Sequence, residues 1–155
     1  MKNKICKNFG FTLVEVMVVV AIVVIMATVA IPGMIRSKIT ANEALAVASC
    51  RTIINSCMFY SSKNEIFPES LAILTVPISN PPYLEEKLAD ATIENKTKNG
   101  YWFEYAASAE GDSFTAQARP KNNLTGKKRF FFNEESLIHY SDSGSDASIN
   151  DPVIN

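Results

Sequence analysis

The chain begins with a short basic stretch and a long apolar one. Residues 1–9 carry three lysines, whereas between Val16 and Ile31 there is no charged residue and Thr28 is the only polar side chain. An apolar run of this length can cross a lipid bilayer as a helix, because a helix satisfies its own backbone hydrogen bonds. The pattern therefore predicts a membrane-spanning helix near the amino terminus.

One acid, Glu15, stands at the head of this apolar run. A carboxylate costs about 2.5 to 3.5 kcal/mol at the centre of a membrane helix and less near its end, so a cationic partner is expected. No Lys or Arg lies between Lys7 and Arg36, which flank the run on opposite sides of the membrane. We therefore expect the partner of Glu15 on another chain.

The sequence around this acid resembles a known export signal. A basic leader, the motif GFTLVE at residues 10–15 and a long apolar helix follow one another, as in type IV prepilins and type II secretion pseudopilins. The resemblance implies that a prepilin peptidase removes the leader, residues 1–10, by cutting between Gly10 and Phe11, and that Phe11 is then N-methylated. The apolar run is retained, unlike that of an ordinary secretory signal.

The resemblance also implies how the subunits assemble. In this family the partner of the acid is the amino group of the first mature residue, here Phe11, on a neighbouring subunit. A carboxylate and an ammonium attract strongly in a low-dielectric bundle, so Glu15 is expected to fix the axial register between subunits. The implied partners are further copies of the chain or other pilins, the prepilin peptidase, an inner-membrane assembly platform and, before assembly, membrane lipid.

The charges that flank the apolar run predict its orientation. Three lysines and the amino terminus precede it, and only Arg36 and Lys38 follow closely. By the positive-inside rule the chain crosses the membrane once, with a cytoplasmic amino terminus and an exported head. The resemblance implies that this membrane is the inner one, that the head is periplasmic, and that the chain then enters a surface pilus or a periplasmic pseudopilus. A secretory signal cleaved after Ala30 and a plain single-pass anchor stay open as alternatives.

The helix is expected to continue beyond the apolar run. Pro32 and Gly33 predict a kink or local melting where the run ends. Residues 11–34 would be the transmembrane half of the helix and residues 35–62 an amphipathic half. Its apolar stripe, which should lie against a sheet, contains residues at helical spacing: Val47, Cys50, Ile54 and Cys57, with Leu45, Ile53 and Met58 beside them.

Residues 63–155 are expected to form a globular head. Prolines divide its variable connection, residues 63–99, and two short helices are predicted there, over 68–74 and 84–91. Residues 100–141 alternate between apolar and polar positions, which predicts an antiparallel sheet of three or four strands; residues 142–155 form a tail. The fold class is therefore α+β, and the resemblance implies the pilin-like fold, with the helix packed on the sheet.

Candidate catalytic groups in the head are few. Ser136, His139 and Asp142 are the residue types of a hydrolase triad, but along a strand His139 points to the opposite face from Ser136. We therefore predict that the protein is not an enzyme and has no cofactor. Cys50 and Cys57 lie about 10.5 Å apart along a helix, too far for a disulfide, and are expected to be buried apolar residues.

Two charged segments of the head have weaker binding interpretations. Calcium favours oxygen ligands, which the Ser/Asp segment 141–151 offers, and the major pseudopilin of type II secretion has a calcium site near its carboxyl end. The order of residues here does not match that site, so we predict a solvated tail and no metal. The basic cluster Arg119, Lys121, Lys127, Lys128 and Arg129 has no interleaved aromatic residue, which argues against nucleic acid as a partner.

The resemblance implies that the protein is a structural subunit of a type IV pilus-like filament, and the sequence patterns agree with this expectation. The alternative is a pseudopilin of a type II secretion system, which calcium-dependent stability of the head would favour. A weaker alternative is a membrane-anchored binding domain that does not polymerise and in which Glu15 is dispensable.

Overall fold

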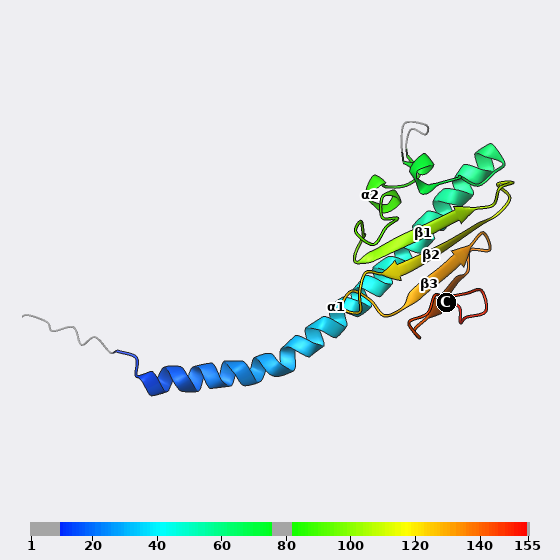
Figure 1. The fold of residues 1–155 in the computed structure, drawn as a ribbon. Coiled ribbons are helices and arrows are strands. Elements are labelled where there is room, and N and C mark those ends of the chain that lie inside the picture. The colour runs from blue at the N-terminus through cyan, green and yellow to red at the C-terminus, as the bar shows by residue number, and fades with distance from the viewer. Residues whose placement is uncertain (1–9, 76–81, 155) are drawn as a thin grey trace, which may run out of the picture. The chain divides into compact units, whose positions relative to one another are not determined.

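The computed structural model describes residues 10–75 and 82–154 (Figure 1). The chain forms two compact units, Met1–Arg36 and Ser37–Asn155, which we describe separately. The leader up to residue 9, with Cys6, and two of the prolines in the variable connection, Pro77 and Pro81, lie outside the described residues.

Helix α1, Leu13–Asn64, contributes to both units and includes Pro32. The long apolar first part of this sequence favours a helix. The helix includes a proline although proline has no backbone N–H to donate. The kink at Pro32 and Gly33 stays a prediction. At its other end α1 stops after Asn64, because Glu65 adopts a positive φ of 64° while its N–H still bonds the carbonyl of Ser61.

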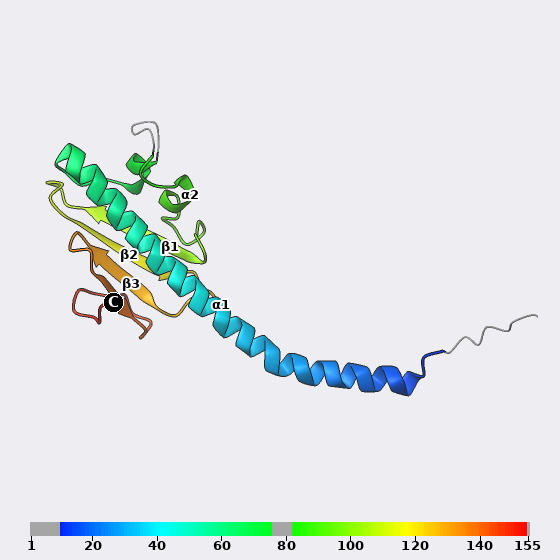
Figure 2. The same cartoon turned by 180° about the vertical axis from the view of Figure 1, so that it is seen from behind.

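The second unit packs the later part of α1 against one face of an antiparallel sheet (Figures 1 and 2). The strands pair in sequence order, β1-β2-β3-β4. Their bounds are Tyr101–Ala107, Phe114–Pro120, Arg129–Asn133 and Ile138–Ser141. This arrangement confirms the predicted α+β fold and settles the number of strands in this sheet at four.

The core lies between the sheet and α1. Register brings Tyr105, Ala116, Phe132 and Ile138 into one row across the four strands. The helix contributes a stripe whose buried members are Ala46, Ser49, Cys50, Ile53, Ile54, Ser56 and Cys57. The prediction was wrong for Leu45, which is 47% exposed, because the helical rotation of about 100° per residue turns it away from Cys50 and Ile54.

The segment between α1 and β1 covers one edge of this core with its described residues, 65–75 and 82–100. It contains a 3-10 helix, η1, Leu71–Leu74, and a short α-helix, α2, Glu86–Ala89, both shorter than predicted. Side-chain hydrogen bonds tie it down: the hydroxyl of Tyr105 donates to the carbonyl of Pro68 at 2.8 Å, and that of Ser56 donates to the carbonyl of Tyr83 at 2.7 Å.

The loop between β2 and β3 is fastened to α1 by two polar side chains. The carboxylate of Glu43 accepts hydrogen bonds from the backbone N–H groups of Lys127 and Lys128, at 3.0 and 3.3 Å, and the amide of Asn42 donates to the carbonyl of Thr125 at 2.8 Å. Gly126 lies between these contacts, against the ring of Tyr101.

We predict that Gly126→Ala destabilises the head. A Cβ at this position would collide with the hydroxyl of Tyr101 and lie 2.7 Å from its Cε2 atom. Tyr101 cannot easily yield, because its ring is buried and its hydroxyl donates to the carbonyl of Lys128. Overpacking of this kind costs about 1 to 3 kcal/mol, measurable by urea unfolding of the detergent-solubilised chain. The neighbouring variant Lys127→Ala, at an exposed side chain, should change stability by less than about 0.5 kcal/mol.

Cys50 and Cys57 are both free thiols inside the core, as predicted. Burial raises the pKa of the Cys57 thiol to about 12, and a hydrogen bond with Tyr105 opposes this rise. Burial also raises the pKa of Cys50 far above its ordinary value. Because the thiolate is the reactive form, both residues behave as small apolar side chains.

We therefore expect Cys50 and Cys57 to resist alkylation in the folded protein. At neutral pH, iodoacetamide should modify them on the order of 100-fold more slowly in the native state than in urea, because few thiolates form and access is blocked. Peptide mass spectrometry would assign each site. Labelling of native Cys57 at the rate of an unfolded thiol would contradict the structure.

Candidate functional site

The amino-terminal unit presents the motif predicted to be processed. Gly10 and Phe11 are exposed and precede the first residue of α1, Leu13. The hydroxyl of Thr12 accepts a hydrogen bond from the backbone N–H of Glu15 at 3.2 Å. Thr12 therefore caps the helix, three residues before an acid in its first turn, as in the sequence pattern of a capping box.

Glu15 is exposed in the first turn of α1. Its negative charge lies near the positive end of the helix dipole, which is a local reason for an acid at this position. Within the described residues its carboxylate makes no ion pair. The group is thus available to a cation from another molecule, and its predicted role in subunit register stays a prediction.

The first part of α1 exposes apolar side chains on all sides. Thr28 does not interrupt this surface, because its hydroxyl donates to the carbonyl of Ile25 at 2.7 Å within the same helix. The helix is long and apolar enough to cross a membrane, and its most apolar stretch is not buried. Such a surface requires lipid or other apolar helices around it.

The head does not assemble the hydrolase triad that its residue types suggested. His139 is buried, and its Nδ1 lies 2.7 Å from the backbone carbonyl oxygen of Asp151. Its Nε2 is buried without a hydrogen-bond partner among the described residues. Ser136 lies in the β3–β4 turn with a positive φ of 63°. Neither ring nitrogen of His139 therefore contacts Ser136 or Asp142.

The basic cluster of the head is largely occupied by internal contacts. Arg119 and Arg129 both pair with Asp146, and the ammonium of Lys128 lies 4.7 Å from the ring centroid of Tyr140. Lys121 and Lys127 are exposed. The cluster is thus divided among separate contacts and does not form a continuous basic surface for a polyanion.

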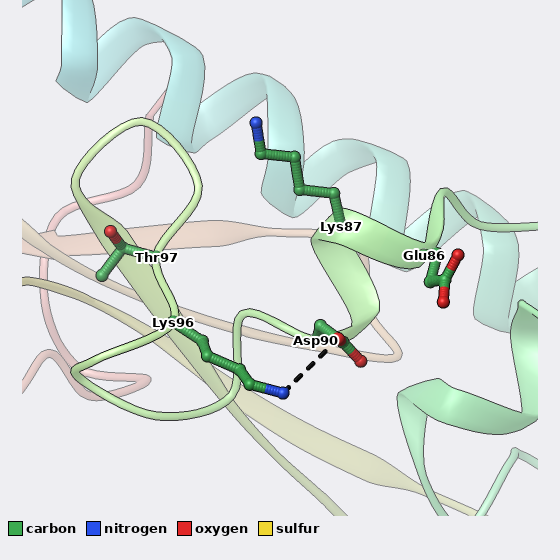
Figure 3. A pocket seen from close by; sticks show the side chains of 5 residues that line it. All are labelled: Glu86, Lys87, Asp90, Lys96 and Thr97. Carbon is green, nitrogen blue, oxygen red and sulfur yellow. Dashed lines mark ion pairs between the residues drawn. The ribbon is translucent and has the colours of Figure 1, made fainter.

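A shallow cavity of about 360 Å³ lies between α2 and the segment that follows it (Figure 3). It is lined by Glu86, Lys87, Asp90, Lys96 and Thr97. Lys96 and Asp90 point toward each other and form an ion pair at 3.5 Å, with both side chains well exposed. The cavity has charges of both signs and no nucleophile held by a base, so its geometry gives no support for catalysis.

Sequence reasoning missed two polar features of the structure. The cap by Thr12 had a local signal, because Thr and Glu three residues apart precede an apolar run. The pairing of Asp146 with Arg119 and Arg129 had none, since 27 and 17 residues separate the partners along the chain.

Comparisons with known proteins agree with this geometry. Residues 5–31 match the family described as the prokaryotic N-terminal methylation motif. The chain is 35% identical over 82 residues to the type II secretion system core protein G of Vibrio cholerae serotype O1. That alignment covers 51% of this chain and 56% of the Vibrio protein, little more than half of each. Both matches support a relationship of this chain to the type IV pilins and type II secretion pseudopilins.

Proposed function

We propose that this protein is a structural subunit of a pseudopilus of the type II secretion kind and polymerises through the first part of α1. The observation that carries the proposal is the apolar, wholly exposed helix directly behind a prepilin-type motif. A head with no assembled catalytic group among its described residues supports a structural role over an enzymatic one.

In this mechanism the subunit is anchored in the inner membrane before assembly and leaves the membrane when it joins the filament. Prepilin peptidase removes residues 1–10, and the new amino terminus at Phe11 is methylated. Apolar side chains from Val16 to Ile31 then exchange lipid contacts for contacts with other helices. Glu15 selects the register, because its carboxylate is stabilised where it meets the amino group of Phe11 on a neighbouring subunit.

A second candidate function is a subunit of a type IV pilus, the function expected from the sequence alone. Both kinds of filament share the motif at residues 10–15 and the apolar helix, so these features do not separate them. The similarity to the Vibrio type II secretion protein favours the pseudopilus. Partners other than the chain itself, including a peptidase, an assembly platform and further pilins, belong to this proposal.

Processing predicts the first residue of the mature protein. Intact-mass and amino-terminal peptide analysis of protein from cells that contain a prepilin peptidase should show a chain starting with N-methylated Phe11. In cells without the peptidase the leader should remain. A mature chain that starts at Met1, or after the apolar run, would exclude the proposal.

We predict that Glu15→Val abolishes or strongly reduces filament formation, because the cation on the neighbouring subunit loses its partner. Sedimentation and electron microscopy of filaments released by lysis of cells that overproduce the chain would measure this. Thr12→Val is the matched control: it removes the helix cap, worth about 1 kcal/mol, but keeps the acid, and should still assemble. Normal filaments from Glu15→Val would refute the proposed role of the acid, as would equal loss in both variants.

A further inference from the structure

The carboxyl-terminal segment folds back onto the last strand of the sheet. The N–H of Tyr140 donates to the carbonyl of Pro152 at 2.9 Å, and the N–H of Ile154 donates to the carbonyl of Ile138 at 2.8 Å. Between β4 and this return lies the Ser/Asp loop, residues 142–151. Oxygen ligands for calcium would have to come together in this loop.

Several side-chain oxygen atoms in and beside the loop are directed to other partners, and the described residues contain no group of three or more His, Cys, Asp or Glu side chains that could hold a metal ion. Both carboxylate oxygens of Asp146 are engaged by arginines. The carboxylate of Asp151 accepts hydrogen bonds from the backbone N–H and the hydroxyl of Ser148, at 2.7 and 3.0 Å. The hydroxyls of Ser141, Ser143 and Ser145 bond one another in a chain. Calcium requires six to eight converging oxygens, and this loop does not present them.

Asp146 is held by two guanidinium groups at once. Arg119 binds it through both oxygens, with Nε 2.8 Å from Oδ1 and Nη2 2.8 Å from Oδ2, and Nη1 of Arg129 lies 2.9 Å from Oδ1. A two-point arginine–carboxylate pair is strong and directional. Hydrogen bonds from Arg119 also lower the pKa of Asp146 below its ordinary value.

Arg119 is itself fixed in place by the outer face of the sheet. Its guanidinium lies 5.0 Å from the ring centroid of Trp102 and pairs with Glu104 on β1. It also donates to the side-chain oxygen of Gln117, a neighbour on β2, at 2.8 Å. The contact with the Trp102 ring, the two-point pair with Asp146 and the two further acceptors together use the planar fork that distinguishes arginine from lysine.

The charges in this cluster balance. Arg119 and Arg129 supply two positive charges, and Asp146 and Glu104 supply two negative ones. A divalent cation that entered here would have to displace both arginines from Asp146 and lie beside them. The residues present therefore do not fit a calcium ion.

We propose that the Asp146 clamp, defined as Asp146 with Arg119 and Arg129, fastens the carboxyl-terminal loop to the sheet in place of a divalent cation, so that the head folds without calcium. The clamp links β2 and β3 to the loop through side chains, which is the structural task that a bound ion would otherwise perform. The inference concerns the head alone and does not depend on the proposed polymerisation.

Thermal unfolding of the full chain in detergent, followed by near-ultraviolet circular dichroism, tests this directly. The melting temperature of the wild type should be the same, within about 1 °C, in EDTA and in millimolar calcium chloride, because only a ligand that binds the native state raises it. An increase of several degrees with calcium would overturn the proposal, and this measurement needs no variant to fold.

Variants distinguish stabilisation by the Asp146 clamp from a general effect of surface charge on stability. Arg119→Gln should lower the melting temperature by about 5 °C or more, and calcium should not restore it. Arg119→Lys keeps the charge but loses the fork, so it should lose most of the same stability. Lys121→Gln removes an exposed charge two residues away and should have no effect. An Arg119→Gln protein as stable as the wild type, or one rescued by calcium, would refute the clamp.

Discussion

The burial of one helical stripe beneath four strands holds the head together. Aromatic residues of the inner sheet face, among them Phe103, Phe130 and Phe132, pack with Cys50 and Ile53 of α1, and all five are essentially inaccessible to solvent. Each large apolar side chain buried in this way contributes about 1.5 to 3 kcal/mol. The loops, the short helices and the carboxyl-terminal return all depend on this layer, because each is fastened to one of its edges.

The first part of the same helix has an exposed apolar surface instead of a buried stripe. There the apolar residues are exposed on all sides, and no element of the amino-terminal unit covers them. Lipid and a bundle of like helices are the two environments that suit such a surface. A protein that moves from one to the other needs a polar group to select the register, since apolar contacts alone are not directional. Glu15 is well placed for this role at the head of the run.

Direct polar contacts hold the loops of the head in place, from side chain to backbone at Glu43 and between side chains at Asp146. Glu43 fastens the β2–β3 loop, and the Asp146 clamp fastens the carboxyl-terminal loop. Under the proposal that the Asp146 clamp takes the place of an ion, calcium dependence of the head does not distinguish a pseudopilin from a pilin in this protein. The similarity to the Vibrio type II secretion protein is the observation that favours the pseudopilin.

The sequence by itself determined the features that rest on neighbouring residues: the apolar helix, the processing motif, the alternation of the strands and the buried cysteines. Short-range periodicity and steric rules are enough for these, because each involves positions within a few residues of one another. Helical geometry also places Leu45 away from Cys50 and Ile54, a local rule that the prediction of the stripe did not apply. Only the tertiary structure decided that His139 meets the carbonyl of Asp151 and that Asp146 meets two arginines. Those contacts join residues distant in the chain, so no local pattern records them.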